Sequence, residues 1–272
     1  STSGDRHQER PLREFGDKGL FVKEIEEALL DGRADAAVHS LKDVPGELSE
    51  GLVLAATPER ADPRDVLISR FPDGLAALPE GAVVATSSLR RRGQLLRLRP
   101  DLRIVDVRGN VDTRIRKVRD GEFDAMILAA AGVLRLGLED EIAEIIPTDE
   151  MIPAATQGIL AIETPVDSPF EEIWKALDDP FVRTAAEAER EFVRAIGADC
   201  HTPAACFCSP ARDETELLRL VAMVCMPDGS RYLSADITCR FCDAVGTARA
   251  AADDLLAQGA REIIEAARAF RP

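Results

Sequence analysis

The sequence predicts an α/β protein that ends in a separate α+β module. From Gly19 to about Leu138, helix-like and strand-like segments alternate, which is typical of α/β units around a mainly parallel sheet. After about Pro180 the pattern changes to a helix, a pair of strand-like segments and a closing Ala-rich helix. The 272 residues are enough for more than one core, and we expect three compact units.

The individual elements follow from hydrophobic periodicity and from turn residues. The first series is a helix at 19–30, strands at 34–38 and 51–56, and a linker-like segment, ATPERADPRD, at 56–65. The second series is a strand at 82–85, a helix from about Leu89, a strand at 103–107, a helix at 111–119 and a strand at 123–130. The C-terminal module is a helix at 181–196, strands at 217–225 and 231–240 joined by the hairpin signal Met226-Pro227-Asp228-Gly229, and one long helix at 244–270.

Composition and charge argue against several classes of protein. The net charge of −15 disfavours a general nucleic-acid binder, which needs a basic surface. No apolar run approaches the roughly 20 residues that cross a bilayer, and no charged-then-apolar leader is recognised, so we expect a cytoplasmic protein without a membrane partner. Six cysteines without obvious pairing favour reduced thiols over a disulfide scaffold, and their spacing predicts no metal site.

One stretch of the chain reverses the overall charge. Between Arg90 and Arg119 there are eleven Lys or Arg residues against three Asp. The candidate binding residues at the strand-to-helix junctions in and just before this stretch are Thr86, Ser87, Ser88, Arg90, Arg91, Arg92, Arg108, Gly109, Asn110 and Arg114. Arginine guanidinium groups form bidentate contacts with carboxylate or phosphate groups, and helix N-termini add amide donors. These junctions therefore predict a cleft for a polyanionic small molecule.

A solvated basic helix face is the alternative interpretation of this stretch. We assign to that face Arg97, Arg99, Arg103, Arg116 and Arg119.

The loop from His39 to Pro45 is a second candidate site. Lys42 and Asp43 lie at the exit of an apolar strand, and Pro45 restricts the backbone that follows. A carboxylate in this position can stabilise a cationic intermediate or move a proton. The alternative is a turn aspartate that accepts hydrogen bonds from local amides, and His39 is expected to be structural.

Cys200 is the cysteine whose setting suggests reactivity. It lies in a Gly/Ala/Asp turn at the end of a predicted helix, with His201 beside it. Such a thiol can be a nucleophile or an attachment point, although an inert cysteine is the more common case.

Five blocks of the sequence form a specific pattern. They are GDKGLFVKEIEEALLDGRADAAVHSLKDVP, ADPRDVLISR, ATSSLRRRGQLLRLRPDL, VRGNVDTRIRKVRDGEFDAMILAAAGVLRLGL and IPAATQGILAIE. With HSLKDVP, TSSLRR and RGNVDTR in this order, the chain resembles the porphobilinogen deaminase (hydroxymethylbilane synthase) family of tetrapyrrole biosynthesis. The resemblance implies two α/β lobes like those of periplasmic binding proteins and a third domain with the cofactor cysteine. The implied domains are 1–58 plus 154–176, 63–153 and 180–272.

The resemblance also implies a transferase reaction and a set of site residues. Four porphobilinogen units, each a pyrrole with an aminomethyl group and two carboxylates, would lose ammonia and join a dipyrromethane cofactor bound through a thioether to Cys200. Asp43 would be the catalytic carboxylate, no metal would be needed, and the protein would be a monomer. The residues implied to bind the cofactor are Cys200, Lys42, Asp43, Thr86, Ser87, Ser88, Arg90, Arg91, Arg108, Gly109 and Arg114. Those implied to bind the substrate are Lys18, Phe21, Arg108, Arg114, Arg135 and Gln157.

The chain departs from the family pattern at four places. The N-terminal strand-and-helix segment with T-R-x-S-x-L-A is not found in it. Ala198-Asp199 stands in place of Gly-Gly before the cysteine, Thr156 replaces a Gly of P-A-x-G-Q-G, and Glu14 stands where a Lys is common. The departures leave open an inactive or altered relative that binds anionic small molecules in the two-lobed cleft without turnover. An Arg-rich RNA-binding module is a third hypothesis.

Overall fold

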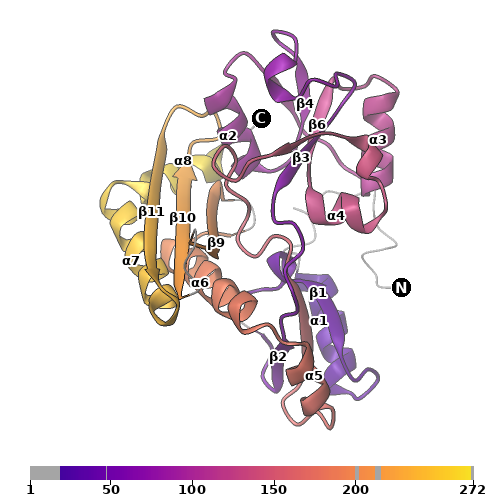
Figure 1. Ribbon diagram of the computed structural model, residues 1–272, viewed down its shortest axis with the longest axis vertical. Coiled ribbons are helices and arrows are strands. Elements are labelled where there is room, and N and C mark those ends of the chain that lie inside the picture. Colours follow the sequence, from indigo (N-terminus) through magenta and orange to yellow (C-terminus); the bar gives the residue numbers. More distant parts are fainter. Residues whose placement is uncertain (1–18, 47, 200–201, 212–215, 271–272) are drawn as a thin grey trace. The chain divides into compact units, whose positions relative to one another are not determined.

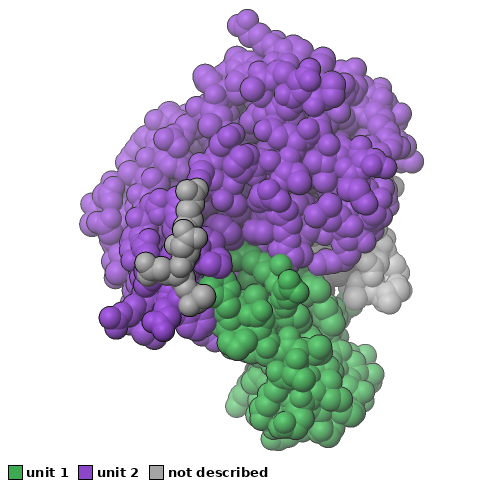
Figure 2. Space-filling view, viewed as in Figure 1, with its two compact units in different colours: residues 1–60, 159–183 green, residues 61–158, 184–272 purple. Residues whose placement is uncertain are grey.

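The computed structural model describes residues 19–46, 48–199, 202–211 and 216–270. The chain divides into two compact units, which Figure 2 shows in different colours. The first unit comprises residues 1–60 and 159–183, and the second comprises residues 61–158 and 184–272. The division into three domains expected from the sequence stays a prediction.

The first unit is built on an antiparallel sheet whose central strand is the last of the three in sequence. The strand order is β1-β8-β2, with β1 (Ala37–Ser40), β8 (Leu160–Pro165) and β2 (Leu52–Ala56). Both β1 and β2 pair with β8 in antiparallel register. The helices of this unit are α1 (Gly19–Leu30), the short 3-10 helix η3 (Leu41–Asp43) and α5 (Glu171–Leu177). Leu29, Ala37 and Leu52 form a small core.

The second unit contains a five-stranded mixed sheet in the order β5-β4-β6-β3-β7. Figure 1 labels its strands β4, β6 and β3. Its strands are β3 (Asp65–Ser69), β4 (Val83–Ala85), β5 (Arg103–Val105), β6 (Ala125–Ala129) and β7 (Ile142–Ile146). β4 runs parallel to β5 and β6, whereas β3 runs antiparallel to β6 and β7. The expectation of a mainly parallel sheet is therefore wrong. The chain passes from the first unit directly into β3. No crossover helix therefore constrains β3 to run parallel to a neighbouring strand.

Helices cover both faces of this sheet. They are α2 (Leu89–Leu98), α3 (Val111–Arg119) and α4 (Ala130–Arg135), with the 3-10 helices η4 (Leu75–Ala77) and η5 (Glu139–Glu141) between strands. Leu95 of α2 packs with Leu67 and Ile127 in one core, and Val118 of α3 packs with Met126 in the other. The sheet is buried on both sides, as the continuous apolar runs of its strands require.

The C-terminal part of the chain is a three-stranded meander covered by helices (Figure 1). Its elements are α6 (Pro180–Ile196), β9 (Ala204–Pro210), β10 (Leu217–Cys225), β11 (Tyr232–Arg240), η6 (Phe241–Asp243), α7 (Ala244–Ala257) and α8 (Ala260–Ala269). The prediction of one helix at 244–270 is wrong, because Gly259 takes a left-handed φ of +98° and ends the first helix. No helix among the described residues is long and apolar enough to span a membrane.

Strands β3, β7, β8 and β9 are additional to the predicted strands. β3 begins at Asp65, the last residue of the segment interpreted as a linker, and Val66, Leu67 and Ile68 are all buried. A strand buried on both faces shows no alternation of apolar and polar residues, so periodicity does not reveal it.

A close contact joins α2 to the C-terminal hairpin within the second unit. A Cβ on Gly93 would overlap Cys225 Sγ and would lie 2.6 Å from Met226 O, so the backbones approach closely only because this residue is glycine. The Arg97 guanidinium lies 4.0 Å from the centroid of the Tyr232 ring. The C-terminal meander therefore helps to hold α2 in place.

Candidate functional site

The loop after β1 presents Lys42 and Asp43 at the surface of the first unit. Leu41 and Val44 are buried, and Leu41 N donates to Ile159 O at 3.0 Å. These anchors fix η3, on which Lys42 and Asp43 are exposed. The carboxylate of Asp43 is therefore held by its neighbours at an accessible position.

His39 stabilises the strand that leads into this loop. Its Nε2 lies 2.9 Å from Glu163 Oε2, and both residues are buried. Because Glu163 belongs to β8, the pair joins the two strands from within, as expected for a structural histidine.

Three hydroxyl residues build the loop before α2. Ser88 is the N-cap, and its Oγ accepts a hydrogen bond from Arg91 N at 3.4 Å. Ser87 Oγ donates to Val107 O at 2.7 Å and accepts from Val107 N at 3.0 Å, which joins this loop to the one after β5. Thr86 is buried, and its Oγ1 accepts from Ser88 N at 3.3 Å. These contacts bring the two loops together, and binding of the cofactor by the hydroxyls stays a prediction.

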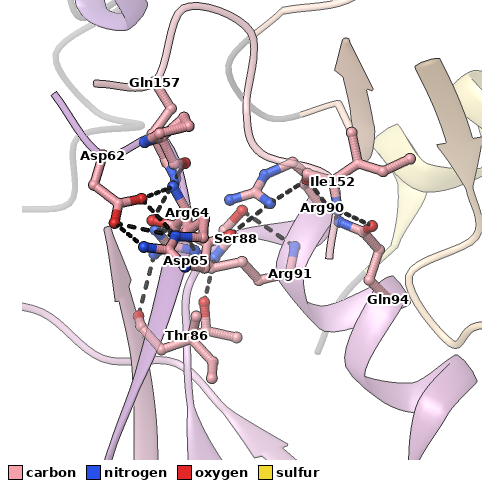
Figure 3. A network of polar contacts seen from close by, with 12 residues as sticks. Asp62, Arg64, Asp65, Thr86, Ser88, Arg90, Arg91, Gln94, Ile152 and Gln157 are labelled. Carbon is pink, nitrogen blue, oxygen red and sulfur yellow. Dashed lines mark hydrogen bonds and ion pairs between the residues drawn. The ribbon is translucent and has the colours of Figure 1, made fainter. Parts of the chain in front are cut away.

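Asp65 is the centre of the buried polar network in Figure 3. The residue is 0% exposed, its Oδ2 lies 2.8 Å from Arg90 Nη1, and its Oδ1 accepts from Arg91 Nη2 at 2.7 Å and from Arg91 Nε at 3.1 Å. Burial by itself would raise the pKa of Asp65, but the two guanidiniums outweigh it and hold that pKa well below its usual range. Asp65 is therefore an anion that pairs with both arginines.

The two arginines differ in what their side chains can reach. Arg90 is 3% exposed, and its Nη1 also donates to Ile152 O at 2.7 Å. Burial lowers the pKa of Arg90, which Asp65 opposes. The Arg91 side chain is 11% exposed, and its Nη1 donates to Ile127 O at 3.2 Å. Arg90 is thus enclosed by protein, whereas Arg91 keeps some contact with solvent.

Two amide side chains complete the network. Gln157 is buried, and its Nε2 donates to Asp65 Oδ1 at 2.9 Å and to Pro63 O at 2.7 Å. Gln94 Oε1 accepts from Ile152 N at 2.8 Å, and its Nε2 donates to Ile152 O at 3.1 Å. Gln157, expected from the resemblance to bind substrate, thus contacts the arginine network, and its role toward substrate stays a prediction.

The turn before β8 is held by a buried carboxylate. Thr156 has a left-handed φ of +59°, and its N–H donates to Glu189 of α6. Glu189 is buried and also accepts from Cys208 N at 2.8 Å. Ala61 N donates to Gly158 O at 3.0 Å. The segments by which the chain enters and leaves 61–158 are therefore hydrogen-bonded to each other.

A second basic group follows β5. Arg114 of α3 is half-buried, and its Nε donates to Gly109 O at 2.6 Å. Burial lowers the pKa of Arg114, and the nearby Arg91 cation lowers it further. Arg108 and Arg135 are exposed. Asp65 thus pairs with Arg90 and Arg91, and the Arg114 cation lies near Arg91. This excess of positive charge suits an anionic ligand.

Other arginines of the basic stretch stabilise the fold. Arg99 Nε donates to Asp101 Oδ1 at 2.8 Å, Arg119 pairs with Glu141, and Arg97 stacks on an aromatic ring. Arg97 and Arg119 are exposed, as expected for a solvated helix face, whereas Arg99 is half-buried against Asp101 and nearby carbonyl groups.

Three predicted site residues lack a described side chain. Lys18 and Cys200 lie outside the described residues, and so does the side chain of Phe21, whose backbone belongs to α1. Their roles stay predictions.

Comparison with known proteins decides the family. The family profile described as "Porphobilinogen deaminase, dipyromethane cofactor binding domain" matches residues 1–170, and "Porphobilinogen deaminase, C-terminal domain" matches residues 183–257. This chain belongs to the porphobilinogen deaminase family. Porphobilinogen deaminases of Roseiflexus sp. (strain RS-1), Sulfurimonas denitrificans and Neisseria meningitidis serogroup B are 49%, 46% and 47% identical to it. The alignments cover 97%, 99% and 98% of this chain and 86%, 86% and 85% of the relatives.

Solved structures of substrate-binding proteins are more distant from this porphobilinogen deaminase family member. A putative methionine-binding lipoprotein from Bacillus subtilis is 16% identical, with a TM-score of 0.39 over 59% of this chain and 76% of its own. A periplasmic substrate-binding protein of an ABC transporter from Coxiella burnetii is 19% identical, with a TM-score of 0.38 over 60% of this chain and 78% of its own. The helices and strands of the chain, together with the two family profiles, give the fold class as α/β with a C-terminal α+β domain.

Two departures from the porphobilinogen deaminase pattern have local structural consequences. The left-handed φ of Thr156 explains why a glycine suits that position. Before Cys200, Asp199 N donates to Thr202 Oγ1 at 2.9 Å, and that hydroxyl donates to Asp199 Oδ1 at 2.8 Å. The Asp199 side chain thus makes a contact with Thr202 that the second glycine of the family pattern would lack.

The cofactor of the porphobilinogen deaminase family fits the charge of the second unit. The profile names a dipyrromethane, which carries carboxylates, and the guanidinium excess around Arg91 and Arg114 is the complement of such a group.

Asp65, Gln94 and the Ile152 carbonyl are the parts of this site that the sequence did not indicate. The available signal was an aspartate directly before the wholly apolar run Val66–Ile68, a position where an acidic side chain needs a buried cation.

Proposed function

We propose that this chain is a hydroxymethylbilane synthase, which condenses four porphobilinogen units on a cysteine-linked dipyrromethane and releases linear hydroxymethylbilane for tetrapyrrole synthesis. The observation that carries the proposal is the excess of positive charge where Arg90 and Arg91 share the carboxylate of Asp65 and the Arg114 cation lies near Arg91. Each porphobilinogen brings two carboxylates, so the remaining positive charge matches the ligand. The three relatives described above, each named porphobilinogen deaminase, support the same function.

The proposed chemistry needs a group that stabilises a cation. When the protonated aminomethyl group of porphobilinogen leaves as ammonia, its C–N bond breaks and an azafulvene cation remains. The dipyrromethane supplies the first free α-carbon, which forms the new C–C bond and then loses its proton. Asp43, exposed on η3, is the proposed carboxylate that stabilises the cation and accepts hydrogen bonds from pyrrole N–H groups.

The ligand carboxylates are proposed to bind arginines with accessible side chains. Arg108 and Arg135 are exposed, and Arg91 and Arg114 are partly buried. Cys200 is the proposed thioether anchor. The other proposed contacts are Lys18, Phe21, Lys42, Thr86, Ser87, Ser88, Arg90, Gly109 and Gln157. A cytoplasmic monomer is part of the same proposal.

Intact-mass measurement tests the anchor. The purified chain is expected to exceed its sequence mass by one dipyrromethane, and Cys200→Ser is expected to have the sequence mass alone. An unmodified wild-type chain that gives no pyrrole colour reaction would count heavily against the proposal.

Asp43→Asn tests the catalytic carboxylate. Turnover of porphobilinogen is expected to fall by about 100-fold or more while the covalent adduct stays in place. Asp35→Asn is the matched control, because Asp35 is an exposed carboxylate of the same unit. Near-normal turnover of Asp43→Asn would remove Asp43 from its role, and porphobilinogen binding without turnover by the unchanged chain would favour the non-catalytic relative.

A further inference from the structure

Among the described residues, Asp65 is the one carboxylate that forms ion pairs with the guanidiniums of Arg90 and Arg91. Arg90 pairs with its Oδ2 at 2.8 Å and Arg91 with its Oδ1 at 2.7 Å (Figure 3). A carboxylate that is 0% exposed needs such partners, since an unpaired buried charge is very costly. The aspartate and the two arginines therefore form one structural unit.

The contact with Asp65 determines which N–H groups of Arg91 remain available to a ligand. A guanidinium has five N–H groups. Nε and one N–H of Nη2 donate to Asp65 Oδ1, and one N–H of Nη1 donates to Ile127 O. The guanidinium is thus fixed in orientation, and two N–H groups have no partner among the described residues.

Asp65 also offsets repulsion between the arginines. The Arg91 cation lowers the pKa of both Arg90 and Arg114, because it repels each of these two cations. Without the carboxylate this repulsion would be unopposed, and the partly exposed Arg91 side chain would be free to turn away. With it, one negative charge pairs with Arg90 and Arg91, and the Arg114 cation lies near Arg91, so the net charge of the group is still positive and attracts anions.

The position of Asp65 is fixed independently of the arginines. The residue begins β3, and Gln157 Nε2 donates to its Oδ1 at 2.9 Å. Gln157 also donates to Pro63 O at 2.7 Å, which holds the amide against the segment before β3. These contacts restrain the Asp65 carboxylate independently of the arginines, so the carboxylate can hold the Arg91 guanidinium in one orientation.

We propose that Asp65 is a positioning residue of the anion site, which orients the Arg91 guanidinium so that its two remaining N–H groups meet a ligand carboxylate. Arg90 supports this arrangement from inside the protein. The proposal rests on the proposed function, since the carboxylates are those of porphobilinogen and of the chain built from it. Asp65 is fully buried and acts through Arg91 rather than by touching the ligand.

Asp65→Asn tests the proposal in the full-length chain, with Asp62→Asn as the matched control. Asp62 lies in the same segment, but its Oδ2 pairs with Arg64 Nη2 at 2.6 Å instead of with an arginine of α2. Asp65→Asn is expected to raise KM for porphobilinogen about tenfold, equivalent to about 1.4 kcal/mol, with a much smaller change in kcat. Asp65→Glu keeps the charge and is expected to recover part of the loss, while Asp62→Asn leaves both constants unchanged. Equal effects of Asp65→Asn and Asp62→Asn would overturn the proposal.

Binding of citrate, a tricarboxylate probe, tests Asp65 without turnover. By titration calorimetry, Asp65→Asn is expected to raise the citrate Kd about tenfold. The Kd of the double variant Asp65→Asn/Arg91→Lys is expected to equal that of Arg91→Lys, because both changes remove the same contact between the oriented Arg91 guanidinium and the ligand carboxylate. Tighter citrate binding by Asp65→Asn would overturn the proposal, since the carboxylate would then compete with ligands. Additive effects of the two substitutions, or no citrate binding by the wild type, would overturn it as well.

The two proposals fail in different ways. If the wild type binds citrate but does not turn over porphobilinogen, the proposed function fails while the citrate titration still tests Asp65. If Asp65→Asn does not fold, as judged by circular dichroism, Asp65→Glu takes its place. The longer side chain displaces the Arg91 guanidinium and is expected to weaken citrate binding about threefold, or about 0.7 kcal/mol. Unchanged citrate affinity in that variant would overturn the proposal.

Discussion

Gly93→Ala is expected to destabilise the protein, although alanine is the better helix former. Gly93 lies in α2, where alanine by itself would stabilise the helix by about 1 kcal/mol. The new Cβ would overlap Cys225 Sγ and would lie 2.6 Å from Met226 O, whereas Cβ atoms essentially never approach other atoms within 3.0 Å. Because Met226 O is backbone, α2 and the hairpin must move apart by about 0.4 Å or more to restore that distance.

The magnitude follows from these two opposing effects. Overpacking of this kind costs about 1–3 kcal/mol, and the helix propensity of alanine offsets about 1 kcal/mol of that cost. We expect a net loss of up to about 2 kcal/mol, and a fall in Tm of about 2–4 °C for each kcal/mol lost. Porphobilinogen turnover is expected to fall as well, because α2 carries Arg90 and Arg91.

Urea unfolding followed by circular dichroism measures this loss, and Gly246→Ala is the control. Gly246 lies in α7, and no atom is within 4 Å of the position that its Cβ would take, so this substitution is expected to stabilise by up to about 1 kcal/mol. Adding Cys225→Ala to Gly93→Ala is expected to restore only part of the stability, since the clash with Met226 O persists. If Gly93→Ala proves as stable as Gly246→Ala, the close contact between α2 and the hairpin does not exist as described.

Two further predictions concern the turn before β8 and the buried carboxylate. Thr156→Gly is expected to be about 1 kcal/mol more stable than Thr156→Ala, because both lose the hydroxyl and only glycine adopts a φ near +59° without strain; equal melting midpoints would contradict this. The folded-state pKa of Asp65 is depressed, so the stability that its charge contributes is fully present above its unfolded pKa of about 3.9 and is lost as the pH falls toward the folded value. The difference in unfolding free energy between the wild type and Asp65→Asn should be constant near pH 7 and shrink below about pH 4; a difference independent of pH would show that the charge of Asp65 does not stabilise the fold.

Local signals were sufficient for the elements that the sequence predicted with correct bounds. α1, α3 and β10 begin and end at the predicted residues. In α3 the reason is visible, since the Asn110 side chain accepts from Thr113 N at 3.0 Å and caps the helix start. Such contacts join residues a few positions apart, so sequence patterns contain them.

The candidate site could be predicted only in part, because its contacts join residues far apart in the chain. The arginines at the strand-to-helix junctions were visible as a local excess of charge. Their partner Asp65 is 26 residues before Arg91 and 92 residues before Gln157, and no local pattern relates these positions. In the sequence, Asp65 therefore resembles part of a charged linker. Only the folded structure shows that it pairs with the arginines of α2.

The strand order of the first unit has a consequence for the order in which the chain can fold. Among the described residues, β1 and β2 pair with β8 and not with each other, and Ala37 faces Glu163 across the sheet. During synthesis, this sheet cannot close until residues 160–165 have left the ribosome, by which time the whole of 61–158 has already been made. Strands β1 and β2 therefore stay unpaired until β8, which is synthesised more than a hundred residues later, becomes available.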